Sequence, residues 1–116
     1  MWRFLLARPR SLALTSAAKA ALVRDMANER HFVPVASVLW AEAATVGRAL
    51  TTSGEIEHRA PHWFVAFYDL AKVARWRVVD IDGIRFTFLR QPALQRLDGA
   101  TLDHEHGHYT VHERGA

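Results

Sequence analysis

The sequence contains no cysteine, and this absence excludes several kinds of chemistry. Without a thiol, the chain by itself can form no disulfide, no thiolate nucleophile and no cysteine-ligated metal or iron–sulfur cluster. A chain that does not depend on disulfides is compatible with a reducing compartment, and we expect a cytoplasmic protein.

Long apolar runs, basic stripes and catalytic motifs are also missing. The opening stretch MWRFLLARPR has an apolar run too short for a signal-peptide core or a membrane span, so we expect no membrane association. The formal net charge is only +3 and the arginines are scattered, which argues against nucleic-acid binding. No P-loop, dinucleotide fingerprint or nucleophile elbow is present, and we therefore do not expect an enzyme.

The composition that remains is that of a globular protein. The 116 residues are 50% hydrophobic, which predicts a single domain over residues 1–116 with one core. Thr15 is placed to cap a helix over residues 16–29, after a short strand around Leu12 and Leu14. One face of this amphipathic helix is apolar. Its apolar positions are Ala18, Leu22 and Met26, flanked by Val23 and Ala27.

Strands are predicted for most of the remaining chain. Residues 35–40 and 62–70 are rich in β-branched and aromatic side chains, and the second segment is apolar on both faces, which is typical of a central strand. Asp82-Gly83 predicts a turn before a strand over residues 84–89. Pro92 predicts the start of a short second helix with Leu94 and Leu97 turned inward, ended by Asp98-Gly99.

The C-terminal part completes this pattern, and one middle segment does not fit it. Leu102, Tyr109 and Val111 are expected to finish the sheet. Residues 51–54 predict an exposed loop or hairpin tip, and residues 42–50 fit either a helical turn or an irregular loop. The order of elements predicts an α+β domain that is mostly β, with mainly antiparallel strands.

Two segments resemble the A-type iron–sulfur carrier, or HesB-like, family. The first is SLALTSAAKAALVRDM over residues 11–26, which is similar to the family's opening strand, threonine cap and alanine-rich helix. The second covers residues 81–111. There a strand that begins at Gly83 leads to a short helix, then to LDGATLD over residues 97–103, and then to a strand that begins at Gly107.

The resemblance implies a small HesB-like β-sandwich or barrel with a helix packed on it. Family members bind iron or an iron–sulfur cluster through three cysteines, often between subunits, and pass it on. The chain has no cysteine at any position, so none of these ligands carries over. The resemblance therefore implies a non-enzymatic, cysteine-less relative of the cluster carriers, acting as a binding or scaffold module.

A histidine-rich segment near the C terminus is the strongest candidate for metal chemistry. In an extended segment, alternation would place His104, His106, His108 and His112 on one face. Neutral imidazoles close together suit zinc or iron, and also copper or nickel. A turn within residues 103–107 would break this common face, and the alternative is a solvent-facing strand that carries histidines on its polar side or titrates as a pH switch. Asp98 and Asp103 are expected to cap the turn rather than to act in catalysis.

A tryptophan between two arginines is the candidate for protein contact. Trp76 lies between Arg75 and Arg77, and these charged neighbours indicate a solvent-exposed edge on which tryptophan can anchor an interface. We expect a protein partner or a homo-oligomer. The alternative function is an unrelated small regulatory domain that recruits its partner through this aromatic edge.

Overall fold

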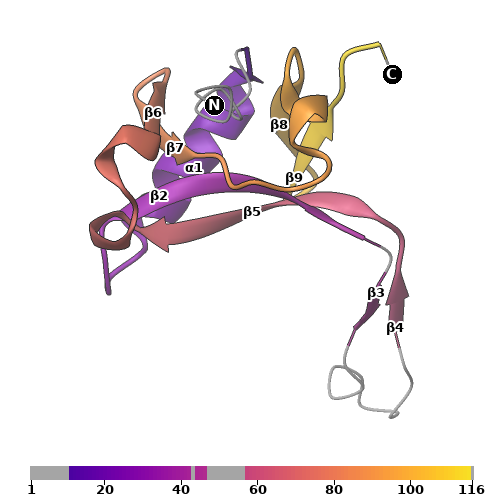
Figure 1. Cartoon of the computed structure of the whole chain (residues 1–116), viewed down its shortest axis with the longest axis horizontal. Coiled ribbons are helices and arrows are strands. Elements are labelled where there is room, and N and C mark those ends of the chain that lie inside the picture. The colour runs from indigo at the N-terminus through magenta and orange to yellow at the C-terminus, as the bar shows by residue number, and fades with distance from the viewer. Residues whose placement is uncertain (1–10, 43, 47–56, 116) are drawn as a thin grey trace, which may run out of the picture.

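The computed structural model describes residues 11–42, 44–46 and 57–115, and for residues 44–46 and 57–59 it describes the backbone (Figure 1). The predicted loop at residues 51–54 lies outside the described residues. The described residues form one α-helix, short 3-10 turns and three open β-sheets, which confirms the α+β, mostly β class. No closed barrel forms among the described strands, so the barrel form of the predicted fold is not observed. No described helix is long and apolar enough to cross a membrane.

The helix α1 (Ser16–Ala27) begins as predicted, at a threonine cap. The Thr15 hydroxyl oxygen accepts a hydrogen bond from the Ala18 N–H at 3.1 Å, which satisfies a backbone donor that the first turn leaves free. The residues of α1 that are buried in the core are Ala18, Ala21 and Leu22. Val23 is 52% exposed, so the apolar stripe is narrower than predicted and turned toward Ala21. Small alanines allow the helix to lie close to β8 (Thr101–Glu105).

The larger sheet has the strand order β5-β2-β7-β6. Its strands are β5 (His62–Asp69), β2 (Pro34–Ala41), β7 (Ile84–Thr87) and β6 (Val78–Ile81). β2 pairs antiparallel with β5 and parallel with β7. The prediction that residues 62–70 form a central strand is wrong, because β5 is the edge and β2 is central. The prediction depended on apolar residues on both faces, but the outer apolar face of β5 is partly open to solvent, with Phe64 39% exposed.

Asp82 and Gly83 form the tight turn between β6 and β7, as predicted. Both residues have positive φ, 52° and 84°, which matches a type I′ hairpin. This turn aligns Ile81 opposite Ile84 and Val79 opposite Phe86. The core-facing side chains of both strands therefore lie on one face.

The smaller sheet has the order β1-β8-β9 and brings the two ends of the described chain together. β1 (Ala13–Leu14) runs parallel to β8, and β8 runs antiparallel to β9 (His108–His112). The 3-10 turn η5 (Leu94–Leu97) buries Leu94 and Leu97, as the sequence predicts. Asp98 holds this end in place by accepting hydrogen bonds from the Ser11 N–H at 3.2 Å and the Ser11 hydroxyl at 3.1 Å. Asp98 thus anchors the start of the described chain beside β8.

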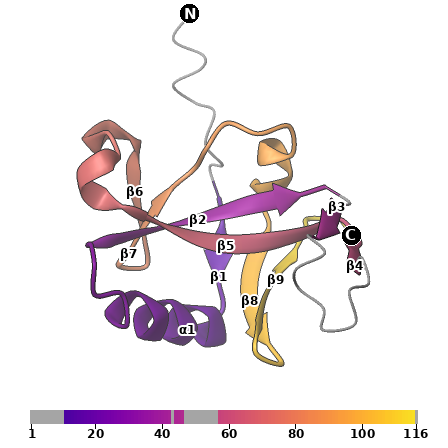
Figure 2. The same cartoon turned by 90° about the horizontal axis from the view of Figure 1, so that it is seen from below.

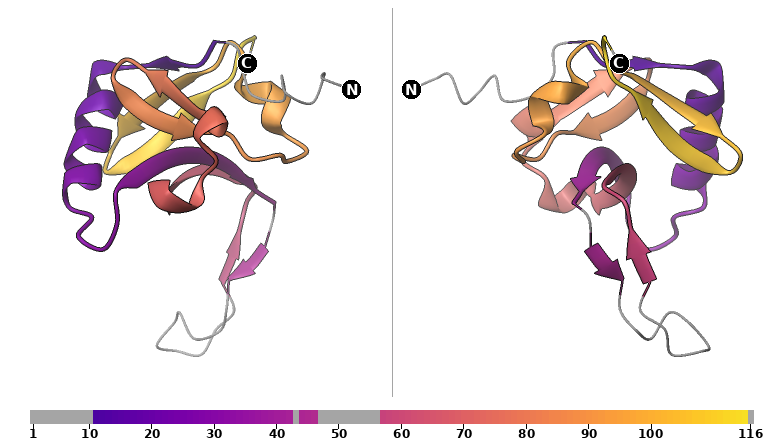
Figure 3. Two further views of the ribbon diagram at one scale, coloured as in Figure 1. Left: turned by 60° about the vertical axis from the view of Figure 1, so that its left-hand side comes forward. Right: turned by 90° about the vertical axis from the view of Figure 1, so that its right-hand side faces the viewer.

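The two sheets cross one another with the core between them (Figure 2). α1 packs along one side of both sheets, and the β8–β9 hairpin lies next to it (Figure 3). The 3-10 turns η3 (Leu70–Lys72) and η4 (Arg75–Arg77) connect β5 to β6. Fully buried members of the core come from α1, both sheets and η5. They include Leu22, Val38, Phe86, Leu97 and Leu102.

The hairpin of β2 and β5 continues beyond the body as β3 (Ala44–Val46) and β4 (Glu57–Arg59). Ala41 lies opposite His62 and Ala44 lies opposite Arg59, so the same register runs through both pairs of strands. Figure 1 shows this arm projecting from the body. Residues 44–46 are therefore a strand and not the helical turn or irregular loop predicted for 42–50; residues 43 and 47–50 lie outside the described residues.

Candidate functional site

The β8–β9 hairpin separates the four histidines that the sequence predicts on one face. His106 and Gly107 form the turn, with φ angles of 53° and 81°. In the register of the hairpin, Glu105 lies opposite His108 and Thr101 lies opposite His112, whereas His104 lies opposite Tyr109. Because opposite residues share a face, His108 and His112 are on one face and His104 is on the other. The prediction of a common face is wrong, because His106 lies in the turn and the chain reverses there, between His104 on β8 and the two histidines on β9.

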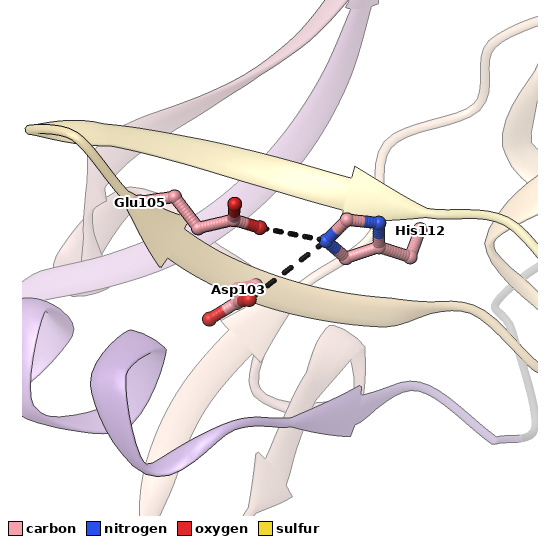
Figure 4. A group of neighbouring side chains, drawn as sticks. All are labelled: Asp103, Glu105 and His112. Carbon is pink, nitrogen blue, oxygen red and sulfur yellow. Dashed lines mark hydrogen bonds and ion pairs between the residues drawn. The ribbon is translucent and has the colours of Figure 1, made fainter.

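The hairpin instead joins one histidine to two carboxylates (Figure 4). His112 Nε2 lies 2.9 Å from Glu105 Oε1 and 3.8 Å from Asp103 Oδ2. One ligand atom from each of these three residues lies within 4.8 Å of the other two. Among the described residues this is the group of acidic and histidine side chains close enough to hold one metal ion. It is open to solvent, since the His112 side chain is 60% exposed.

Threonine hydroxyl groups donate hydrogen bonds to the carboxylates of Asp103 and Glu105 and hold them in place. The Thr15 hydroxyl donates to Asp103 Oδ1 at 2.6 Å, and the His104 N–H donates to the same oxygen at 2.8 Å. These bonds, the Thr15 hydroxyl first, hold the pKa of Asp103 below its usual range. They leave Oδ2 directed toward His112. Thr110 donates to Glu105 Oε1 at 3.3 Å. Hydrogen bonds of this kind, made to a carboxylate by a neighbouring hydroxyl or N–H group, orient carboxylates that bind metals.

The opposite face of the hairpin packs on α1 through a separate polar cluster. Tyr109 donates its hydroxyl hydrogen to Asp25 Oδ2 at 2.5 Å, and the His104 ring meets the Tyr109 ring edge-on at 4.9 Å. Burial, and then the hydrogen bond to Asp25, raises the pKa of Tyr109. Hydrogen bonds from Arg24 and Tyr109 lower the pKa of Asp25. His104 is thus held in the contact between β8–β9 and the helix.

Because of the contact between Tyr109 and Asp25, we expect the protein to lose stability at alkaline pH. The raised pKa of Tyr109 stabilises the fold below the ordinary tyrosine value near 10, and that contribution is lost as the pH rises toward the folded pKa. We expect the urea midpoint of the wild type to fall between about pH 8 and about pH 11. Tyr109→Phe should reduce this fall, and Tyr68→Phe is the matched control. Equal slopes for the wild type and Tyr109→Phe would contradict the assignment.

A second cluster, which the sequence did not indicate, closes the base of the hairpin arm. Arg96 donates to both carboxylate oxygens of Glu113, at 2.8 and 2.6 Å, and its guanidinium lies 4.1 Å from the centre of the Trp40 ring. Trp63 donates its indole N–H to Glu113 at 3.1 Å. Gln91 bonds to the backbone of Val38 and Trp40. These contacts tie η5 and the segment after β9 to β2 and β5, which is a structural role.

The predicted interface residues lie on η4. Trp76 is 60% exposed, and Arg75 and Arg77 are exposed beside it. The Arg77 guanidinium lies 4.9 Å from the centre of the Trp76 ring. The structure therefore places this tryptophan at the surface and far along the chain from the hairpin site.

Asp103 and Glu105 were not identified from the sequence as partners of a histidine. The available signal was the His106-Gly107 pair, because a two-residue turn there places Glu105 opposite His108 and brings Asp103 and Glu105 to the face of His112. Comparisons give no relatives for this arrangement. No family model, curated protein or solved structure matches the chain.

Proposed function

We propose that this protein is a non-enzymatic binding module that holds one divalent metal ion on the β8–β9 hairpin through Asp103, Glu105 and His112. The observation that carries the proposal is the convergence of one imidazole nitrogen and two carboxylate oxygens within 4.8 Å. These donors come from two paired strands, and Thr15 and Thr110 hold the carboxylates in place. Rigid strands position ligands better than a loop does.

The donor set favours zinc or ferrous iron. Imidazole nitrogen suits both ions, and carboxylate oxygens complete their coordination, whereas magnesium and calcium prefer sites made of oxygen alone. The contact between His112 and Glu105 also forms as a hydrogen bond without metal. A metal must displace the shared proton, so binding should weaken as the pH falls.

Titration calorimetry with zinc and, without oxygen, with ferrous iron tests this site. We expect one ion per chain for the wild type, and His112→Ala should weaken binding by at least about 100-fold because it removes a direct ligand. His106→Asn is the matched control, since asparagine tolerates the positive φ of that turn and the side chain lies outside the group. Binding no tighter than millimolar, or equal affinity in His112→Ala, would overturn the proposal.

We also propose descent from the HesB-like carriers. The strand β1, the Thr15 cap and α1 occur in the order that the resemblance implies, and η5 leads through Asp98 and Gly99 into β8. A relative that has lost its cysteines should carry metal without sulfide. Measuring metal and acid-labile sulfide in the protein as purified checks this expectation, and sulfide in a stoichiometric amount would contradict the loss of the cluster.

A second candidate function is recruitment of a protein through the surface formed by Trp76, Arg75 and Arg77. The observation that favours it is the 60% exposure of Trp76, a residue that is common at the centre of protein interfaces. If this surface mediates self-association, Trp76→Ala should abolish it without unfolding the domain.

A further inference from the structure

The strand that carries His112 is the outer strand of its sheet. The order β1-β8-β9 leaves the second edge of β9 without a hydrogen-bonded strand among the described residues, although β5 also lies close to β9. An edge strand presents a row of backbone N–H and C=O groups to any extended strand that reaches it. β9 is five residues long, and its outward face is polar.

The sequence of β9 is nearly symmetric about its centre. It reads His108-Tyr109-Thr110-Val111-His112. If two copies paired antiparallel about Thr110, each His108 would lie opposite a His112, each Tyr109 opposite a Val111, and the two threonines opposite one another. Threonine pairs and pairs of an aromatic with a β-branched residue are favourable across antiparallel strands.

This pairing would also complete the metal site. Opposite side chains in an antiparallel pair have Cβ atoms about 5 Å apart, so His108 of the partner subunit would lie beside His112 on the face of Asp103 and Glu105. The chain's own His108 is four residues from His112, about 13 Å along the strand, and it does not belong to the group. Zinc in structural sites takes four protein ligands, and one chain supplies three.

We propose that zinc joins two copies of this chain through β9. Each of two equivalent ions is held by Asp103, Glu105 and His112 of one copy and by His108 of the partner subunit. The proposal rests on the metal site described under the proposed function and names the partner that this site requires. It assigns a role to His108, which the hairpin places on the correct face but out of reach of its own site.

The mass in solution with zinc and after its removal by EDTA tests the pairing, measured by sedimentation equilibrium. We expect 13.1 kDa without zinc and twice that mass with it. His108→Ala should still bind zinc, about 10-fold more weakly, yet remain a monomer. His112→Ala should lose both properties. A mixture of the two variants should regain a dimer with one zinc ion per pair, because one intact site remains.

The other outcomes overturn the inference in distinguishable ways. Zinc bound tightly by a protein that stays monomeric would overturn the pairing and leave the proposed function intact. A dimer that persists in EDTA and in His108→Ala but is lost in Trp76→Ala would show that η4 is the interface. A dimer that persists in EDTA and in both variants would indicate another sheet edge, such as β5. Absence of zinc binding would overturn both proposals.

Discussion

Phe86→Ala should destabilise the domain by about 3–5 kcal/mol, the largest effect we expect from a single substitution. Phe86 is fully buried on β7, opposite Val79 of β6 and in register with Ala36 of β2, and its ring stacks on that of Phe88 at 5.9 Å. Removing the ring leaves a cavity between the two sheets that the paired strands cannot close. Because a domain of this size is stable by only about 5–15 kcal/mol, the variant should be close to unfolding at room temperature.

Phe64→Ala is the matched control for this prediction. It makes the same chemical change on β5, but Phe64 is 39% exposed on the outer face of the same sheet, so the loss should be about 1 kcal/mol or less. Urea denaturation of both variants gives the comparison, provided that the dependence on urea stays unchanged. If the two variants lost equal free energy, the core would not lie where the structure places it.

Thr15→Ala should lower the free energy of unfolding by about 2 kcal/mol. One hydroxyl both accepts from the Ala18 N–H, as a helix cap, and donates to the Asp103 carboxylate. A cap contributes about 1 kcal/mol, and losing the hydrogen bond to the Asp103 carboxylate adds to this, although not in full, because one residue makes both bonds. The loss should be larger above about pH 4 than in acid, since the lowered pKa of Asp103 stabilises the fold only where the carboxylate is ionised.

The same substitution should weaken zinc binding by about 10-fold, because Asp103 would lose the bond that orients it. Thr15→Ser keeps the hydroxyl and should restore both stability and affinity. Urea denaturation reports the first effect and calorimetry the second. A Thr15→Ala variant that is less stable but binds zinc as well as the wild type would show that the threonine acts only as a helix cap.

Much of the fold follows from local patterns in the sequence. Thr15 before an alanine-rich stretch, the Asp82-Gly83 turn and the inward Leu94 and Leu97 each depend on neighbours within a few residues, and each prediction is confirmed. The placement of β5 at an edge was not predictable in this way. It depends on pairing between β2 and β7, which are distant in the chain. Apolar residues on both faces of β5 do not show by themselves whether the strand is central or at an edge. The pairing of β2 with β7 decides this.

The candidate site shows the same division between local and distant information. The sequence indicated the histidine-rich segment, and a turn within it was one stated alternative. The group that forms depends on register, which places His112 beside Glu105 and Asp103 and directs His104 to the helix. The Arg96–Glu113–Trp63 cluster joins three separate parts of the chain, and no spacing in the sequence relates them.

The shared register of β2–β5 and β3–β4 means that the arm can change its length without disturbing the body. Adding the same number of residues to β3 and to β4 would leave Trp40 opposite Trp63 and every inner pair unchanged. A single added residue has no such compensation. If the slip reached β5, Val65 and Phe64 would exchange faces, and an exposed ring would be forced into the core. Related chains should therefore differ here by matched insertions on both strands.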